Sequence, residues 1–362
     1  MKDLKDKKVL VTGSCGTVGS ELVNQLLSSQ YAIKELIGID NNESELFFQD
    51  QDHLNDDRAH FYVCDIRDEE SLTERMSGID VVFHCAALKH VILCERSPDQ
   101  AIETNIHGVK NVISASQKNN VGVVIFTSSD KAVNPTNVMG TTKLMGERLI
   151  TAANNSQREG NTIFASTRFG NVLGSNGSVV PIFHNQIKNG GPVTVTDKEM
   201  TRFVMSIEES VRLVIDSALQ AKGGEVFITK MPVLRICDLA IAMVDELSKS
   251  YGHKKEDIRI DEIGSKPGEK LYEELMSDEE TRRSLELNKY FSVMPAFKGI
   301  YSNISYDYSE IVSSDVKNTY ISANEPALAV NEIKALLHNW QLLTKPALEQ
   351  DARYWPGDKE EK

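Results

Sequence analysis

The sequence predicts an α/β fold in which a doubly wound parallel sheet is joined to a smaller C-terminal lobe. Apolar runs of four to seven residues alternate with helical segments over the first 170 residues, which is the pattern of strands buried on both faces. The alternation then gives way to a stretch rich in Gly, Asn and Ser. We therefore predict a first domain at 1–170 with return segments near 204–230, a lobe at 171–203 and 231–295, and a C-terminal extension at 296–362.

The composition argues against several kinds of partner. The chain has 362 residues, a formal net charge of −13 and a pI near 5.2, which argues against nucleic acids and anionic membranes. No apolar run approaches the roughly 20 residues that span a bilayer, and the first residues lack the apolar core of a signal peptide. The five cysteines show no paired or metal-ligand spacing. We therefore expect free thiols, a cytoplasmic setting and no membrane insertion.

A glycine-rich turn follows the first predicted strand. Residues 9–12 are apolar, Gly13, Gly16 and Gly19 come next, and a helix is predicted over 20–28. A strand before and a helix after make this spacing typical of a turn that binds a dinucleotide pyrophosphate at a helix N-terminus.

The second and third predicted strands, 35–39 and 61–64, each end in an aspartate. Asp40 lies about 20 residues after the glycines, where a carboxylate accepts hydrogen bonds from the adenosine ribose and repels a 2′-phosphate. No arginine stands beside it to receive that phosphate, so we expect NAD rather than NADP. Asp65 is a candidate for the adenine edge.

The fourth predicted strand, 81–83, leads to His84 and His90. No third ligand has suitable spacing, so we predict no metal site. The helix predicted over 98–117 carries Asn105 on an apolar stripe, where a structural role and a functional role fit equally well.

The fifth predicted strand, 123–126, runs into the sequence T-S-S-D-K-A-V-N-P-T-N-V-M-G-T-T-K at residues 127–143. Many NAD enzymes have a Tyr-x-x-x-Lys pair here, in which the lysine lowers the tyrosine pKa and so makes a base. This chain keeps Lys143 but has Met139 at the tyrosine position. Either the chain is an inactive dehydrogenase, or the proton chemistry has moved to Asp130 and Lys131.

Asp130 and Lys131 fit a reaction that needs both an acid and a base. Oxidation of a secondary alcohol to a ketone makes the neighbouring C–H acidic. A neutral lysine can remove that proton if Lys143 and the nicotinamide charge lower its pKa, while a carboxylic acid protonates a β-hydroxyl and expels water. Candidate positive charges for a pyrophosphate, each of a type also common on solvated surfaces, are Arg202, Lys266 and Lys270.

Taken together, the motifs resemble those of the nucleotide-sugar 4,6-dehydratases. The matching strings lie within residues 8–295 and include T-G-x-x-G-x-x-G, H-C-A-A-L-K-H-V, the 127–143 stretch, R-F-G-N-V-L-G-S-x-G-S-V-V-P and K-P-G-E-K-L-Y-E-E-L. This family belongs to the extended short-chain dehydrogenase/reductases, in the polysaccharide-biosynthesis branch that acts on UDP-N-acetylglucosamine. The resemblance implies a Rossmann-type fold and a tightly held NAD that is reduced and reoxidised within one turnover. It also implies a 4-keto-6-deoxy product and a homo-oligomer, either a dimer or a hexamer.

The resemblance also implies roles for individual residues. Asp130 is the expected acid at the C6 hydroxyl and Lys131 the expected base at C5, with Thr127 and Ser129 able to relay a proton. Met139 leaves open which group accepts the proton of the C4 hydroxyl. The candidate cofactor-binding residues are Gly13, Ser14, Gly16, Thr17, Val18, Gly19, Asp40, Asp65, Ile66, Ala86, Ala87, Lys89, Asn105, Thr127 and Lys143. The candidate substrate-binding residues are Lys89, His90, Asn171, Ser178, Val179, Gln186, Thr196, Arg202, Lys266 and Glu269.

Two alternatives stay open at the level of sequence. A 4-epimerase or 5-epimerase on the same scaffold gives a product of unchanged mass. A non-catalytic NAD-binding protein, which Met139 suggests, binds the cofactor without turnover.

Overall fold

The structure is a computed structural model that describes residues 3–28, 30–156, 160–175, 178–264, 268–297 and 304–343. The chain divides into two compact units. The first comprises Met1–Asn171, Ile207–Met231 and Tyr272–Glu325, and the second comprises Val172–Ser206, Pro232–Leu271 and Pro326–Lys362. These boundaries differ from the predicted ones, because residues 272–325 join the first unit and the segment from Pro326 joins the second.

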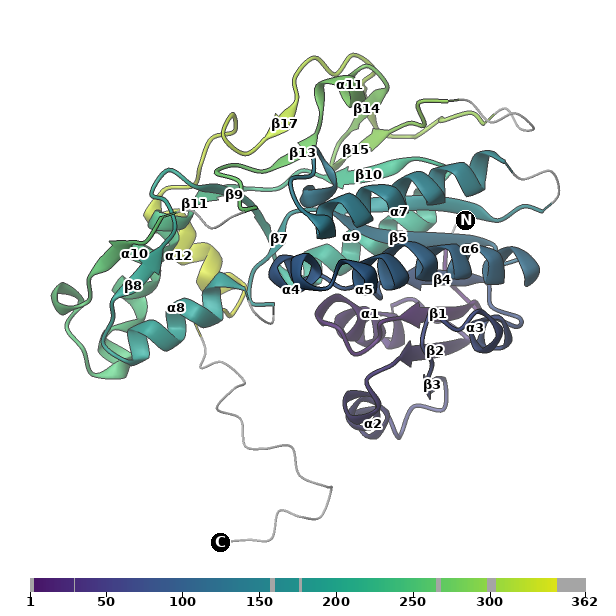
Figure 1. Cartoon of the computed structure of the whole chain (residues 1–362), viewed down its shortest axis with the longest axis horizontal. Coiled ribbons are helices and arrows are strands. Elements are labelled where there is room, and N and C mark those ends of the chain that lie inside the picture. Colours follow the sequence, from purple (N-terminus) through teal and green to yellow (C-terminus); the bar gives the residue numbers. More distant parts are fainter. Residues whose placement is uncertain are drawn as a thin grey trace, which may run out of the picture. The chain divides into compact units, whose positions relative to one another are not determined.

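The first unit is built on a ten-stranded sheet of order β16-β14-β15-β10-β6-β5-β4-β1-β2-β3 (Figure 1). The strands from β10 to β3 pair in parallel, so the predicted doubly wound α/β fold is confirmed. The parallel strands are β1 (Lys8–Thr12), β2 (Glu35–Asp40), β3 (Ala59–Val63), β4 (Val81–His84), β5 (Val123–Ser129), β6 (Ile163–Phe169) and β10 (Val226–Thr229).

Three antiparallel strands extend this sheet beyond β10. They are β15 (Tyr290–Val293), β14 (Ser284–Leu287) and β16 (Ile311–Ser313). Strands β13 (Glu274–Met276) and β17 (Tyr320–Ile321) form a separate antiparallel pair. Along the chain, β13 precedes the short helix α11 (Asp278–Thr281), and β17 follows β16. Residues 272–325 lack the strand–helix alternation of a parallel sheet, so their sequence does not indicate that they join the first unit.

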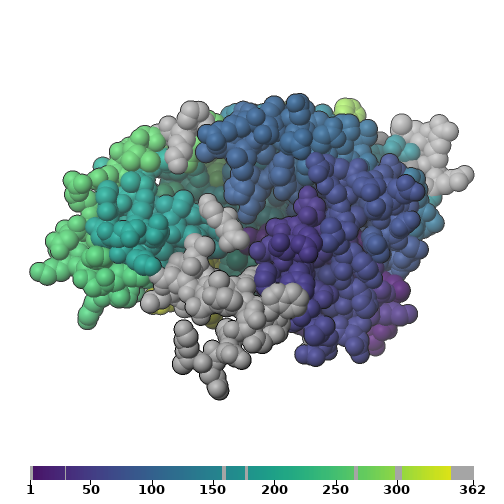
Figure 2. Space-filling model, turned by 60° about the horizontal axis from the view of Figure 1, so that its bottom comes forward, coloured from purple at the N-terminus to yellow at the C-terminus, as the bar shows by residue number. Residues whose placement is uncertain are grey.

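Helices cover both faces of the sheet. Helices α3 (Glu69–Arg75), α6 (Gly108–Lys118) and α7 (Val138–Asn155) contact one another in turn, and α1 (Thr17–Leu27) contacts α9 (Ile207–Gln220). The N-terminal part of the chain, purple to blue in Figure 2, shows closely packed side chains on the face seen in this view. Strand residues such as Leu10, Val82 and Val124 are fully buried with α6 and α7 in one apolar cluster, which fixes the face that each strand presents. Helices α2 (Glu43–Asp52) and α4 (Val91–Arg96) also belong to the first unit.

The helix predicted over 98–117 is broken into three parts. Helix α5 (Pro98–Ile102) and helix α6 are joined by a π-helical turn, η1 (Glu103–His107), which contains the buried Asn105. Such turns are frequent at functional sites.

In the described part of the second unit, three helices pack with two small sheets. Helices α8 (Val179–Lys188), α10 (Ile236–Leu247) and α12 (Val330–Asn339) enclose an apolar core that includes Phe183, Met243 and Leu337. The sheets are β11 (Val233–Arg235), β9 (Thr201–Met205) and β7 (Asn171–Val172), and β8 (Val193–Val195) with β12 (Ile260–Glu262). The short 3-10 turns η3 (Lys249–Tyr251) and η4 (Lys255–Asp257) also lie in the second unit, whereas η2 (Asp130–Ala132) lies in the first. In the described part of the chain, no helix is long and apolar enough to cross a membrane.

Candidate active site

The glycine turn between β1 and α1 has the shape that a pyrophosphate requires. Gly13 has φ of +68°, and a Cβ on it would lie 2.7 Å from the backbone of Ala86, so a side chain is excluded at this position. Helix α1 begins after Gly16 with no acidic residue and no side-chain cap in its first turn. Its first N–H groups are therefore suited to an anion, and the residues present fit the predicted dinucleotide.

Asp40 lies at the end of β2, as predicted, and its carboxylate holds the glycine turn. It accepts hydrogen bonds from the N–H groups of Cys15 at 3.1 Å and Asn42 at 3.0 Å. Asp65 is engaged differently: its carboxylate accepts both a backbone and a bidentate side-chain contact from Arg67, which lowers the pKa of Asp65. An adenine contact by Asp65 stays a prediction.

Asn105 fastens the loop that follows β4. Its amide oxygen accepts from the Leu88 N–H at 2.8 Å, and its amide nitrogen donates to the Leu88 carbonyl at 2.9 Å and to Thr142 Oγ1 at 3.0 Å. These bonds occupy the side chain, so Asn105 acts by holding the loop that contains Ala86 and Ala87. Lys89 and His90 lie exposed at the end of this loop.

His84 is a structural residue of the sheet. It is fully buried, its Nδ1 lies 2.7 Å from Thr12 Oγ1, and burial lowers the pKa of its imidazole to about 3, so the ring is neutral. Among the described residues, no group of three or more His, Cys, Asp and Glu side chains could hold a metal ion.

The catalytic candidates lie where β5 ends. The 3-10 turn Asp130–Ala132 follows Ser129, whose side chain accepts the Lys131 N–H. Helix α7 presses against this turn at Gly140, where a Cβ would lie 2.2 Å from the Lys131 carbonyl oxygen. The strand end, the turn and the helix thus fix the backbone of Asp130 and Lys131.

Asp130 and Lys131 form a close ion pair. Asp130 is only 4% exposed, and its two carboxylate oxygens lie 3.1 and 3.0 Å from Lys131 Nζ. Burial raises the pKa of Asp130, but the Lys131 charge and the hydrogen bonds from Ser129 and Lys131 outweigh this effect, and the net pKa lies below its ordinary value. Asp130 is therefore a carboxylate at neutral pH.

Glu273 also belongs to this site, and sequence reasoning missed it. The Glu273 side chain is 5% exposed, its Oε1 lies 3.7 Å from Lys131 Nζ, and it accepts the Asn171 amide at 3.0 Å. Asn171, a predicted substrate-binding residue, is thus bonded to a carboxylate of the site. The available signal is two adjacent glutamates, of which the second begins the short strand β13, but our prediction names Glu269 instead.

The side chains of Lys143 and Met139 are both buried in the first unit. The Lys143 ammonium donates to the Thr127 carbonyl at 2.9 Å, and burial lowers its pKa to about 8. The Thr127 hydroxyl donates to the His84 carbonyl at 3.1 Å. Met139 is buried in an apolar cluster with Cys94 and Ala101, so its side chain is occupied by packing.

The predicted substrate-binding residues of the second unit are largely engaged with neighbours in that unit. The Gln186 side-chain amide donates a hydrogen bond to Thr194 Oγ1 and accepts one from the Thr194 N–H. Arg202 donates to the carbonyls of residues 201, 270 and 271, and it lies 3.8 Å from Glu269. The Thr196 hydroxyl contacts the Met200 sulfur. Ser178 and Val179 stand at the start of α8, and Lys266 falls outside the described residues.

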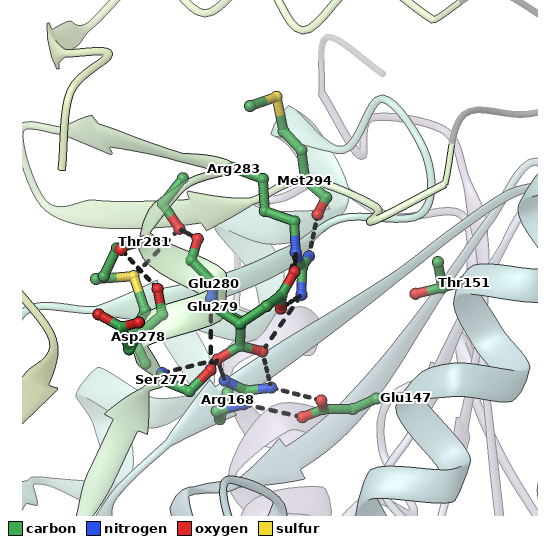
Figure 3. A network of polar contacts seen from close by, with 12 residues as sticks. Glu147, Thr151, Arg168, Ser277, Asp278, Glu279, Glu280, Thr281, Arg283 and Met294 are labelled. Carbon is green, nitrogen blue, oxygen red and sulfur yellow. Dashed lines mark hydrogen bonds and ion pairs between the residues drawn. The ribbon is translucent and has the colours of Figure 1, made fainter. Parts of the chain in front are cut away.

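A second charged cluster anchors the segment that carries Glu273 (Figure 3). Arg168, at the end of β6 and 1% exposed, donates to both oxygens of Glu147 and both oxygens of Glu280 at 2.6–3.1 Å. It also donates to the Leu275 carbonyl at 2.7 Å. Ser277 and Glu280 form a capping box at the start of α11. This cluster ties β6 and α7 to the 273–280 segment.

Comparison with known proteins places this architecture among related sequences. The profile described as "Polysaccharide biosynthesis protein" matches residues 9–295. A Methanocaldococcus jannaschii protein named as an uncharacterized membrane protein is 48% identical over 291 residues, 80% of this chain and 86% of that protein. A Rickettsia felis protein named UDP-glucose 4-epimerase is 37% identical over 342 residues, 92% of this chain and 96% of that one.

Solved structures share the fold. The X-ray structure of Pen from Bacillus thuringiensis is 41% identical, with a TM-score of 0.85 over 94% of this chain and 99% of that one. The dTDP-glucose 4,6-dehydratase DesIV of Streptomyces venezuelae, solved with NAD, is 23% identical, with a TM-score of 0.64 over 73% of this chain and 86% of that one. This second likeness concerns the fold alone.

Proposed function

Since the chain belongs to the polysaccharide biosynthesis protein family, we propose that it is an NAD-dependent 4,6-dehydratase of a nucleotide-activated N-acetylhexosamine, with UDP-N-acetylglucosamine as the first substrate to test. The observation that carries this proposal is the pairing of a buried carboxylate and an amine, Asp130 and Lys131, at the end of the central strand β5. A simple dehydrogenase needs a base at one oxygen, whereas a dehydration also needs a carbon base and an acid for the departing hydroxyl.

The first unit supplies residues that fit the cofactor. Gly13, Gly16 and the first turn of α1 would hold the pyrophosphate, Asp40 the adenosine ribose, and Lys143 the nicotinamide ribose. When bound, NAD would take a hydride from C4 and return it to C6. The carboxylate at the end of β2 favours NAD over NADP.

Asp130 and Lys131 carry the proton chemistry in this proposal. Because Asp130 is ionised at neutral pH, it can accept the proton of the C4 hydroxyl while C4 is oxidised. The resulting carboxylic acid then gives this proton to the C6 hydroxyl, which leaves as water. Lys131, which is 33% exposed, first loses its ammonium proton to solvent; the neutral amine then removes the C5 proton and returns a proton to C5 after the double bond is reduced. No tyrosine is needed, which agrees with the buried position of Met139.

The test is turnover with NAD and UDP-N-acetylglucosamine, followed by mass spectrometry and by proton NMR in heavy water. The expected product is lighter by one water, with deuterium at C5. Intact substrate at high enzyme concentration across several nucleotide sugars would contradict the proposal. A Lys131→Ala variant should bind NAD but give no product.

An epimerase is the second candidate, and the name of the Rickettsia felis relative favours it. An epimerase transfers the C4 hydride away and back to the same carbon, and so gives an isomer of unchanged mass. The ion pair of Asp130 with Lys131 has no task in that reaction. The mass of the product therefore separates the two candidates in one measurement.

A further inference from the structure

Glu273 reaches the catalytic pair from a distant part of the chain, although the dehydration just described assigns it no step. Its Oε1 lies 3.7 Å from Lys131 Nζ and accepts the Asn171 amide at 3.0 Å. Lys131 Nζ also lies 3.0 Å from Asp130 Oδ2. A lysine side chain is long and has many rotamers, so contacts with two separate segments restrict where its amine points. The position of Glu273 therefore affects the group that must remove the C5 proton.

A second segment, residues 320–322, holds the backbone of Glu273. The Glu273 N–H donates to Ser322 Oγ at 2.9 Å, and the Ser322 N–H donates to the Glu273 carbonyl at 2.9 Å. Ser322 is fully buried. Beside these bonds, β17 pairs antiparallel with β13, which begins directly after Glu273 (Figure 1). One buried residue is thus bonded to Glu273 at both its N–H and its carbonyl.

Strand β17 is itself fastened to the main sheet of the first unit. The Tyr320 hydroxyl accepts the Met231 N–H at 2.8 Å and donates to the Met231 carbonyl at 3.1 Å. The centroid of its ring lies 5.3 Å from that of Phe291 on β15. A strand of two residues makes few ladder bonds of its own, so these contacts keep β17, and with it Ser322, in place.

We propose that Ser322 is a positioning residue for the base at C5. Through its two hydrogen bonds with the Glu273 backbone, it fixes the Glu273 side chain and thereby the direction of the Lys131 amine. Ser322 lies beyond residue 295, where the match to the family profile ends. The C-terminal extension therefore contributes to the geometry of the active site. This proposal rests on the proposed function, and a part of its test is free of it.

The kinetic test is Ser322→Ala, which removes the hydroxyl that accepts the Glu273 N–H. A displacement of about 1 Å in a reacting group can cost about 10²-fold in rate, so we expect kcat to fall by about 10–10²-fold. The KM for the nucleotide sugar and the Kd for NAD should stay within about twofold, because the lost effect belongs to the transition state. With substrate deuterated at C5, the isotope effect on kcat should rise, since proton removal at C5 becomes the slow step.

The matched control is Ser217→Ala. It removes another buried hydroxyl of the first unit, which donates to the Leu213 carbonyl at 2.7 Å within α9. Its kcat and isotope effect should equal those of the unmodified protein. If Ser322→Ala lowers kcat without raising the isotope effect, Ser322 is merely structural and the proposal is overturned.

A double-mutant cycle shows whether Ser322 acts through Glu273. In Glu273→Ala the side chain that Ser322 positions is gone, so a further Ser322→Ala change should lower kcat by less than about twofold. Losses that multiply in the double variant would show two independent effects and would overturn the proposal.

A second variant loosens the same contact from farther away. Tyr320→Phe removes the hydroxyl that bonds Met231 and leaves Ser322 unchanged. We expect kcat to fall by about two- to fivefold with a raised isotope effect, a smaller change than in Ser322→Ala. If Ser322→Ala does not fold, Tyr320→Phe decides alone, and an unchanged kcat in this variant then overturns the proposal.

A measurement without substrate separates this inference from the proposed function. Trace acetylation by acetic anhydride, followed by mass spectrometry of the peptide that contains residue 131, reports how readily the Lys131 amine reacts. A nearby carboxylate favours the unreactive ammonium, so Ser322→Ala should raise the reaction rate by about twofold or more, whereas Ser217→Ala should not. An unchanged rate in Ser322→Ala would overturn the inference. A raised rate in a protein that turns over no nucleotide sugar would refute the proposed function, while the link from Ser322 to Lys131 stands.

Discussion

Two clusters in the first unit each place one cation between two carboxyl groups, and they differ in which cation it is. Arg168 is 1% exposed and is bonded to both oxygens of Glu147 and of Glu280. Lys131 is 33% exposed and lies 3.0 Å from Asp130 but 3.7 Å from Glu273. In the first cluster every carboxylate oxygen accepts a guanidinium bond, whereas in the second the contacts are uneven and one edge is open to solvent.

The difference separates a cluster that holds structure from one that can move protons. A guanidinium never loses its proton in a protein, and its planar fork matches carboxylates in pairs. An ammonium is a point charge whose proton can leave when its surroundings change. The Arg168 cluster fixes the 273–280 segment, and this segment brings Glu273 to Lys131. We infer that the rigid cluster sets the geometry in which the labile one works.

Exchanging the cation of the labile cluster should give the largest effect. Lys131→Arg keeps the positive charge but removes the proton that can be released, so kcat should fall by about 10²–10⁴. The free energy of unfolding should change little, because Lys131 is partly exposed. The matched control is Lys118→Arg, at a lysine paired with Glu69 on the surface. A Lys131→Arg protein that retains most of its turnover would show that no proton leaves this position.

The opposite exchange should damage stability rather than chemistry. Arg168→Met removes the guanidinium that bonds the buried Glu147 and Glu280 and leaves Arg283 at 3.8 Å from Glu280, and we expect the free energy of unfolding to fall by about 3–5 kcal/mol. Arg168→Lys should recover only part of this loss, because an ammonium cannot make two parallel pairs of bonds. Urea unfolding followed by circular dichroism measures both. Arg282→Met is the control, since the exposed pair of Arg282 with Asp278 should contribute less than about 1 kcal/mol. An equal loss of unfolding free energy in Arg168→Met and Arg282→Met would contradict a structural role for the Arg168 cluster.

The pH dependence of stability sharpens the same contrast. Burial raises the pKa of Glu280, but the Arg168 guanidinium lowers it from 4.5 to about 2. A carboxylate with a depressed pKa in the folded state contributes stability above its unfolded pKa, and this contribution is lost as the pH falls through the folded value. At neutral pH we expect Glu280→Gln to cost about 3 kcal/mol at roughly 1.4 kcal/mol per pH unit. The difference in unfolding free energy between the unmodified protein and Glu280→Gln, measured by urea unfolding, should narrow as the pH falls below about 4.5. A gap that stays constant to pH 3 would place the effect of Glu280 outside this ion pair.

Much of the first unit could be predicted from the sequence because local signals coincide with long-range ones there. Apolar runs, the glycine turn and Asp40 sit in one continuous stretch, and parallel strands bring their carboxyl ends to the same edge. This arrangement of strand ends alone predicts that Asp130 and Lys131 lie at the carboxyl edge of the sheet. The comparison with Pen, at 41% identity and a TM-score of 0.85, agrees with the predicted fold.

What escaped prediction depends on pairing between distant segments. The strands β14, β15 and β16 join the main sheet from residues 284–313, and nothing in their local sequence says that they return to it. Glu273 meets Lys131 across more than a hundred residues of chain, through a segment anchored by Arg168. The π-helical turn at Asn105 likewise depends on the bonds that its side chain makes with Leu88, which an amphipathic pattern does not indicate.

The smallest effect is expected at Met139, the residue that first set this chain apart from tyrosine-dependent dehydrogenases. Met139 is 4% exposed and packs against Cys94 and Ala101. In Met139→Tyr, a larger ring must fit the same space and its hydroxyl must find a partner, so we expect stability to fall by about 1–2 kcal/mol. We expect no gain in kcat, because Asp130 already accepts the C4 proton. Met139→Leu, a swap of similar volume, should cost less than about 1.5 kcal/mol.

Measuring kcat and urea unfolding on both Met139 variants separates packing from chemistry. A faster Met139→Tyr enzyme would mean that a tyrosine at this position reaches the C4 hydroxyl and that Asp130 is a poor base for it. Asp130 and Lys131 would then keep two tasks, acid at C6 and base at C5, and would no longer accept the C4 hydroxyl proton. An unchanged rate with lowered stability would instead leave all three proton transfers with Asp130 and Lys131. That result would account for a chain that dispenses with the tyrosine yet keeps Lys143 four residues later.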